Sequence, residues 1–327
     1  RCHGLLVAHS CGKSPVGRLL NQMIDRLEKP VFFIGFPRSG TTIIFETFVQ
    51  NPEYGWLSNY AEMWPTVISA NVLCRILDNS LIRLRGHKKQ YGRVRLGNRY
   101  FPQPVEAYAF WDYFTGINFS RDYLLGQSAD AAACERVREA LQKSMLYQGK
   151  ARFVTKLTGP GRVRYLLSMF PDAQFIHVIR DGRAAVESLL RVEFWRDQGG
   201  MDAPFWTNGL KSGAIEDWEA SGKDSVVLAA HQWKRIIETT RDEAGGLGKD
   251  QYTEVKYEDF VASSQAVTNG LLSWTGLEID AMKTQASMTG AGISDMNRKY
   301  LDVFSGDQVA VINRIMGPLL GQLGYKL

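Results

Sequence analysis

The residues with the clearest capacity for chemistry lie near the N-terminus, in the stretch VFFIGFPRSGTT at residues 31–42. A short apolar run, rich in β-branched and aromatic residues, comes first and predicts a buried strand. A loop framed by Gly35 and Gly40 follows, and an apolar helix is expected after it. Loop amides and a helix N-terminus attract anions, so this segment predicts a phosphate or sulfate site. Its donors would come from Arg38, Ser39, Gly40, Thr41 and Thr42.

The spacing of the two glycines nearly matches the nucleotide-binding P-loop, G-x-x-x-x-G-K-[ST]. Thr42 stands at the hydroxyl position, but Thr41 stands where a nucleotide triphosphatase has its lysine. A basic residue, Arg38, lies inside the loop instead, which favours a nucleotide with a different phosphate pattern. The form PRSGTT after an apolar strand resembles the 5′-phosphosulfate loop of the sulfotransferase family, whose donor is 3′-phosphoadenosine 5′-phosphosulfate (PAPS). The alternative is an ordinary strand-to-helix turn.

A second segment, FPDAQFIHVIRDGRAAVESLLR, predicts a strand at residues 175–179 and a helix from about Arg183. Arg180 follows the strand, and Ser188 comes eight residues later. A guanidinium offers a bidentate fork to phosphate, and a hydroxyl near a helix start adds a donor. The resemblance implies that this Arg and Ser hold the 3′-phosphate of the donor. The alternative is a helix-start ion pair between Asp181 and Arg183.

Two further segments resemble the same family. VKYEDF, at residues 255–260, implies that Tyr257 stacks on the adenine; the alternative is a core tyrosine whose hydroxyl has a partner. The stretch MNRKYLDVFSG resembles the family's closing segment, which implies that Arg298 and Lys299 contact the donor phosphates. Tyr300 follows this basic pair where cytosolic members have glycine.

Sulfuryl transfer needs a base beside the acceptor hydroxyl and cations beside the leaving phosphate. We expect Arg38 on the leaving-group side and no metal. Cytosolic sulfotransferases carry a K-T-H segment whose His is the base, whereas the matching stretch here, ARFVTKLTGP, has Lys156 and no histidine. Lys156 is expected to act catalytically at the bridging oxygen or the sulfuryl group; a structural ion pair is the alternative.

The base is therefore expected to be a carboxylate. Carbohydrate- and protein-modifying branches of the family use a Glu shortly after the loop helix, and NYAEMWP supplies Glu62 there. The aromatic neighbours Tyr60 and Trp64 predict a raised pKa for Glu62. Glu106, in QPVEAYAFWDYF, is the rival base, and a helix-start carboxylate is the alternative for Glu62. This pattern resembles the carbohydrate and general bacterial-type branch more than the K-T-H branch.

Alternating strand and helix signals predict an α/β fold of three layers, in which helices flank a central parallel sheet. Ligands of such sheets lie at the carboxyl ends of the strands, where Arg38 and Arg180 are expected. We expect one domain over residues 1–327, with an aromatic and basic, largely helical or irregular acceptor-binding insertion at about 62–134 and a lid-like loop at about 195–225. Helices are predicted at residues 17–27, 131–148 and 225–244.

Composition is compatible with one large core, since 45% of the 327 residues are hydrophobic. The chain contains no apolar run of about 18 residues, and its four cysteines lack C-x-x-C spacing, so we expect free thiols and a cytoplasmic protein.

Residues 83–99 carry seven basic and no acidic side chains. This segment indicates either a solvated loop or a surface for an anionic acceptor, the donor or lipid headgroups, which includes peripheral membrane contact. Nucleic acid is not expected, because no base-reading module accompanies the charge.

The expected function is transfer of the PAPS sulfuryl group, by in-line attack, to a hydroxyl of a carbohydrate, glycolipid or small-molecule alcohol. Dense aromatic residues at 100–119 predict a wall for that acceptor. Two alternatives stay open. One is a P-loop kinase of a small molecule, with Asp181 as its Mg²⁺ ligand, and the other is a non-catalytic protein that binds PAPS or its product PAP on the same scaffold. The sequence leaves the oligomeric state open.

Overall fold

The computed structural model describes residues 27–79, 84–85, 100–277 and 297–326. The helix expected at residues 17–27 and most of the basic segment at 83–99 lie outside the described residues.

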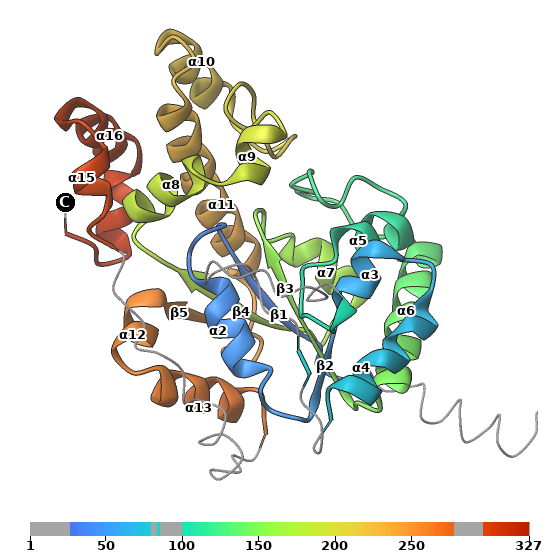
Figure 1. Cartoon of the computed structure of the whole chain (residues 1–327). Coiled ribbons are helices and arrows are strands. Elements are labelled where there is room, and N and C mark those ends of the chain that lie inside the picture. Colours follow the sequence, from blue (N-terminus) through green and yellow to red (C-terminus); the bar gives the residue numbers. More distant parts are fainter. Residues whose placement is uncertain (1–26, 80–83, 86–99, 278–296, 327) are drawn as a thin grey trace, which may run out of the picture.

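A sheet forms the centre of the molecule, and helices lie on both of its faces (Figure 1). The strands are β1 (Val31–Gly35), β2 (Tyr54–Trp56), β3 (Arg152–Thr158), β4 (Gln174–Ile179) and β5 (Tyr252–Lys256). The helices are α2 (Thr41–Phe48), α3 (Asn59–Met63), the 3₁₀ helix η1 (Ile68–Asn71), α4 (Val72–Leu77), α5 (Tyr108–Thr115), α6 (Ala131–Gln148), α7 (Val163–Met169), α8 (Gly182–Leu190), α9 (Glu193–Asp197), α10 (Ser212–Ala220), α11 (Ser225–Ala244), α12 (Tyr257–Ala262), α13 (Ser264–Trp274), α15 (Tyr300–Val303) and α16 (Gly306–Gln322).

Neighbouring strands of the described sheet all run parallel, in the order β2-β3-β1-β4-β5. Strand β1 is central, and its Phe33 pairs with Lys156 of β3 on one side and Ile176 of β4 on the other. Helical segments connect the parallel strands, as parallel pairing requires. The carboxyl ends of β1, β3 and β4 therefore lie side by side, at the edge where ligands of α/β proteins bind. The predicted three-layer α/β fold is confirmed.

Alternate residues of β1 enter different cores. Phe32 packs into a cluster with α5, α6 and α7, whereas Phe33 packs with α2 and α13 on the opposite face of the sheet. The ring of Phe33 lies 5.0 Å from that of Phe48 in α2, centre to centre. Because successive side chains of a strand point to opposite faces, two adjacent phenylalanines help build two cores. A third cluster joins α8, α11 and α16 around Trp233.

Helices α6 and α11 have the bounds that the sequence predicted, and their ends are set by local caps. Asp130 accepts a hydrogen bond from the amide of Ala133 at 2.6 Å at the start of α6. Gly149, with a φ of 68°, ends that helix in the left-handed region. Asp224 accepts from the amide of Val226 at 2.7 Å at the start of α11. Such caps pair amides and carbonyls that the helix itself leaves open.

The segment at residues 195–225 differs from the long loop that the sequence suggested. It contains helix α10, and its tryptophans Trp195, Trp206 and Trp218 are buried in the cluster around α11. Trp206 also packs so closely on Gly159 that a Cβ there would lie 2.6 Å from its Nε1. The aromatic anchors explain the order of this Gly-rich segment, and a lid function for it stays a prediction.

The predicted insertion at 62–134 carries α3, η1, α4 and α5 within its described part. None of the described helices has the length and apolar character of a membrane span.

Candidate active site

The loop between β1 and α2 turns at two residues in the left-handed region. Arg38 has a φ of 69° and Gly40 a φ of 82°. A Cβ at Gly40 would lie 2.2 Å from the Cδ2 atom of Tyr257, and one at Gly35 would lie 2.4 Å from the carbonyl oxygen of Val178. The two glycines therefore let β4 and the Tyr257 ring approach the loop closely.

Two buried hydroxyls of this loop lack a hydrogen-bond partner among the described residues. They are Ser39 Oγ and Thr41 Oγ1, in side chains that are 0% and 2% exposed. Leaving a buried hydroxyl unpaired costs about 1 to 3 kcal/mol, and a bound ligand is one way in which such a group gains a partner. Helix α2 begins beside them, directly after Gly40, and its N-terminus favours negative charge. These residues fit a bound phosphate or sulfate group.

Segments that are 142 residues apart in sequence meet at Arg38. Its Nε donates to Ser188 Oγ at 3.0 Å, and its carbonyl oxygen accepts from Arg180 Nη1 at 2.9 Å. Partial burial, followed by the nearby charge of Arg180, lowers the pKa of Arg38. Two cations held this close repel one another, and an anion between them would relieve that repulsion. The structure thus brings together the three residues that the two motifs supplied separately.

Arg180 is nearly buried and is held by a polar network. Its Nε donates to Asn297 Oδ1 at 2.7 Å, and its guanidinium lies 4.6 Å from the centre of the Tyr257 ring. Asn297 Nδ2 donates to Glu258 Oε1 at 2.7 Å, and the same oxygen accepts from the amide of Asp181 at 3.1 Å. Sequence analysis missed Asn297 and Glu258, although both adjoin residues of the family-like segments. Stacking of Tyr257 on adenine stays a prediction.

Arg298 and Lys299 directly follow Asn297, and both side chains are exposed. The chain therefore brings them near Arg180, while their contact with a donor stays a prediction.

Arg183 Nη2 lies 2.7 Å from Asp181 Oδ2, and hydrogen bonding to Asp181 raises the pKa of Arg183. The ion pair that was considered as the alternative is therefore present at the start of α8. It does not involve Arg180.

Lys156 lies on β3 beside the loop, with 1% of its surface exposed. Its Nζ donates to Thr42 Oγ1 at 2.8 Å and lies 3.3 Å from Glu106 Oε1. Thr158 Oγ1 donates to the same Glu106 oxygen at 2.9 Å. A buried ammonium with a carboxylate and a hydroxyl as partners is held in one position. Lys156, Thr42 and Glu106 thus form one cluster near the carboxyl end of β3, which includes the predicted ion pair.

Glu62 lies on α3 and contacts the start of α5, where its Oε2 accepts from the amide of Ala109 at 3.2 Å. Partial burial raises the pKa of Glu62, and the charges of Glu106 and Asp112 add to the rise. The rise has the direction expected from the sequence. The alternative, a helix-start carboxylate, also describes Glu62, which lies in the first turn of α3. The two candidate bases interact electrostatically, so they lie in one region beside α5.

The described histidines make contacts elsewhere. His177 is fully buried in β4, with Nδ1 2.7 Å from the hydroxyl of Tyr252. His231 Nε2 lies 2.7 Å from Asp217 Oδ2 on α10. Among the described residues, no three His, Cys, Asp or Glu side chains lie together as a metal site would need. Carboxylates therefore remain the candidate bases near the loop.

Comparison with known families agrees with this geometry. A sequence model of a protein family, described as "Sulfotransferase family", matches residues 30–281, which is most of the chain. The chain therefore belongs to the sulfotransferase family, and the protein is a sulfotransferase. The matched region includes the loop of Arg38, the segment of Arg180 and Ser188, and Tyr257, and it ends before Arg298.

Solved structures with a similar fold include sulfotransferase STF9 from Mycobacterium avium, at 17% identity and a TM-score of 0.57, covering 94% of this chain and 80% of that one. The sulfotransferase domain from the curacin biosynthetic pathway has 15% identity and a TM-score of 0.49, covering 92% of this chain and 99% of that one. Sulfotransferase STF1 from Mycobacterium tuberculosis H37Rv has 16% identity and a TM-score of 0.47, covering 93% and 80%. The first of these shows that the chain shares the sulfotransferase fold. A search of curated proteins found no match.

Proposed function

We propose that this sulfotransferase moves the sulfuryl group of PAPS to a hydroxyl acceptor. The observation that carries the proposal is the hydrogen-bonded group of Arg38, Ser188 and Arg180 beside two buried, unpaired hydroxyls. PAPS has anionic groups at both its 5′ and 3′ positions, and it needs two cationic sites at a fixed separation. In this protein, a member of the sulfotransferase family, the loop after β1 and the start of α8 offer two such sites.

The donor site is assembled from four segments. Amides and hydroxyls of the loop hold the 5′-phosphosulfate, and Arg180 with Ser188 holds the 3′-phosphate. When bound, PAPS supplies the sulfuryl group, and its phosphate keeps the electrons of the S–O bond that breaks. The full set of proposed donor-binding residues is Arg38, Ser39, Gly40, Thr41, Thr42, Arg180, Ser188, Tyr257, Arg298 and Lys299.

Two cations of the chain act on the leaving-group side. Arg38 lies in the loop and places its guanidinium beside the 5′-phosphate. Lys156 Nζ is already fixed by Thr42 and Glu106, at 2.8 and 3.3 Å, so its charge needs little rearrangement to act at the bridging oxygen. Charge that is positioned before the reaction stabilises the transition state most effectively. No metal is part of this proposal.

Glu62 takes the proton of the acceptor hydroxyl as that oxygen attacks sulfur. A general base works best when its pKa lies near the working pH and when the acceptor can reach it. Solvent reaches the side chain of Glu62, and the loss of part of its hydration against α5 raises its pKa. Glu106 instead holds Lys156 and Thr158, so we assign it to the positioning of Lys156.

The acceptor is a hydroxyl of a carbohydrate, a glycolipid or a small-molecule alcohol. Aromatic faces near Glu62 support this class, because they bind sugar rings and apolar groups alike. The rings of Tyr60 and Trp64 are stacked, with centres 6.3 Å apart, and Trp64 is 49% exposed. Tyr113, on α5, is 57% exposed.

Isothermal titration with PAP tests the donor assignment, with adenosine 5′-monophosphate and with ATP plus Mg²⁺ as controls. We expect tight binding that depends on the 3′-phosphate. Binding of ATP with Mg²⁺ alone would favour the kinase alternative, although Asp181, its proposed metal ligand, is paired with Arg183. Binding of PAP without turnover of PAPS on any hydroxyl acceptor would favour the non-catalytic alternative.

A matched pair of variants tests the base. Glu62→Gln should lower kcat by about 10² to 10⁴-fold, the usual contribution of a general base, and leave PAP affinity unchanged. It should also remove the acidic limb of the pH–rate profile. If Glu62→Gln keeps the parent rate while Glu106→Gln abolishes turnover, Glu106 is the base and our assignment is wrong.

A further inference from the structure

Helix α4 and the segment before it turn apolar side chains towards solvent. The stretch of residues 63–77 contains a single charged residue, Arg75. Six of its large apolar side chains are 37 to 54% exposed, namely Met63, Trp64, Val67, Val72, Leu73 and Ile76. We call these six residues the apolar ridge. Surface helices normally turn such side chains towards the core, so the ridge indicates a contact outside the chain.

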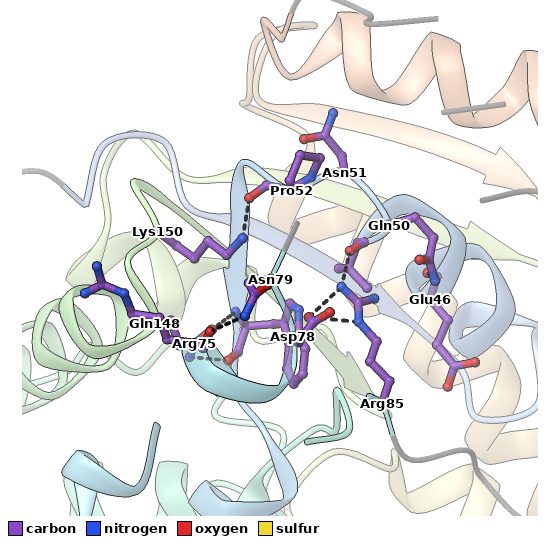
Figure 2. A network of polar contacts seen from close by, with 12 residues as sticks. Glu46, Gln50, Asn51, Pro52, Arg75, Asp78, Asn79, Arg85, Gln148 and Lys150 are labelled. Atoms are coloured by element: carbon purple, nitrogen blue, oxygen red, sulfur yellow. Dashed lines mark hydrogen bonds and ion pairs between the residues drawn. The ribbon is translucent and has the colours of Figure 1, made fainter. Parts of the chain in front are cut away.

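Helix α4 is held to the protein by Cys74, its buried residue, and by the polar residues that flank it. Asn71, Cys74 and Asp78 are 3%, 3% and 8% exposed. Asn71 Oδ1 accepts from Gln148 Nε2 at 3.3 Å. Asp78 Oδ2 lies 2.8 Å from Arg85 Nη2, and both residues are labelled in Figure 2. Rotating α4 to bury its aliphatic side chains would leave these buried polar groups without partners. The outward direction of the ridge is therefore set by the fold.

Arg85 fixes α4 to the body of the protein. Besides its ion pair with Asp78, it donates to the carbonyl oxygen of Val49 at 3.1 Å and lies over the Trp56 ring, 5.5 Å from its centre. Helix α4 is thereby joined to the end of α2 and to β2, at one edge of the sheet (Figure 1). The ridge is a stable surface, because its position does not depend on its own apolar contacts.

A basic stretch of the sequence is attached to the ridge at both of its ends. The chain between Asn79 and Tyr100 carries seven basic and no acidic residues. Both of its ends adjoin the ridge, since Asn79 Nδ2 donates to the carbonyl oxygen of Arg75 at 3.1 Å and the carbonyl oxygen of Tyr100 accepts from Tyr60 of α3. Asp78, the acid nearest to α4 in sequence, is neutralised by Arg85.

We propose that the apolar ridge docks this protein on a membrane surface that contains anionic lipids. Apolar side chains enter the boundary between headgroups and acyl chains, and nearby cations are attracted to anionic headgroups. Each of two copies placed ridge to ridge would contribute the seven basic residues between Asn79 and Tyr100, and like charges repel. An anionic lipid surface therefore fits both the apolar and the cationic features.

Docking on the ridge has a consequence for the acceptor. Glu62 directly precedes Met63, so the ridge begins next to the proposed base. A hydroxyl on a membrane-held amphiphile would then approach Glu62 from the side of the ridge. This consequence rests on the proposed function, whereas membrane docking itself does not.

Flotation of the full chain with vesicles tests the proposal, using phosphatidylcholine alone and a mixture with phosphatidylglycerol. We expect binding to the anionic vesicles that weakens at high salt. The double variant Leu73→Ser, Ile76→Ser should bind about tenfold less tightly or worse, because it removes two exposed apolar side chains that would enter the bilayer. The matched control is Leu301→Ser, Val303→Ser on α15, whose side chains are 57% and 54% exposed, and it should bind like the parent.

Three results would overturn the proposal: no binding of the parent to anionic vesicles, equal binding by the ridge variant, or an equal loss in the control variant. If the parent ignores vesicles but the ridge substitutions dissociate a dimer in solution, the ridge is a protein interface. PAP titration of each variant verifies folding. The titration also separates the two proposals. If the parent protein does not bind PAP, the donor site is refuted, while the outcome of the vesicle experiment is unaffected.

Discussion

Acid should destabilise the folded protein through His177, in the middle of β4. Its side chain is fully buried, and its Nδ1 lies 2.7 Å from the hydroxyl of Tyr252. That hydroxyl donates its proton to Glu254 Oε1 at 2.8 Å, so the imidazole donates from Nδ1. Nε2 is then an unprotonated nitrogen, buried and without a partner among the described residues. The folded state therefore holds a neutral imidazole.

The size of the effect follows from the pKa of His177, which burial lowers from 6.5 to about 4. Between these pH values the unfolded chain binds a proton that the folded chain does not bind. Stability therefore falls as the pH falls through this window and is unaffected by His177 above it. At about 1.4 kcal/mol per pH unit, the loss reaches about 3 kcal/mol by about pH 4.

Urea unfolding of the parent and of His177→Leu, at several pH values from about 7 to 4, measures this loss. The variant lacks the titrating group, so its free energy of unfolding should fall by about 3 kcal/mol less than that of the parent over the window. His231→Gln serves as the control, because His231 is paired with Asp217 on another pair of helices and should leave the parent's loss intact. Equal losses in the parent and His177→Leu would refute the reasoning that the folded state excludes a charged imidazole.

Three further predictions concern the donor site. Arg180→Ala should weaken PAP binding by about 10- to 150-fold, as expected for a lost charged hydrogen bond, and leave adenosine 5′-monophosphate unaffected in titrations; equal loss for both ligands would contradict the 3′-phosphate assignment. Gly40→Ala should destabilise the protein by about 1 to 3 kcal/mol or more in thermal unfolding, because its Cβ would meet the Tyr257 ring, whereas Gly213→Ala, with open space around it, should not. Lys156→Met should lower kcat by about 10² to 10³-fold with PAP affinity nearly kept, and a change in affinity alone would argue for a structural role.

Local sequence signals were sufficient for most of the fold. Helices α6 and α11 match their predicted bounds because Asp130, Gly149 and Asp224 cap them, and caps act within one turn of the chain. Strands β1 and β4 lie where short apolar runs predicted them. The segment at 195–225 was less predictable, because its order depends on tryptophans that pack on a helix outside the segment.

The candidate site was predicted in part. Arg38, Arg180 and Ser188 were found because the family-like motifs carry them, and their mutual contacts agree with a shared role. Glu258 and Asn297 were missed, since a carboxylate and an amide in ordinary positions carry no local signal. Their importance arises only from the hydrogen bonds that connect them to Arg180.

The sequence by itself determined the strand-loop-helix cradle and the parallel α/β architecture, because periodicity, glycines and motif spacing act over short stretches of chain. Only the tertiary structure decided which distant side chains meet. It joined Lys156 to Glu106, and it buried the polar residues Asn71 and Asp78 that flank α4. Such contacts depend on how separate elements pack, and the spacing of residues along the chain carries no record of that packing.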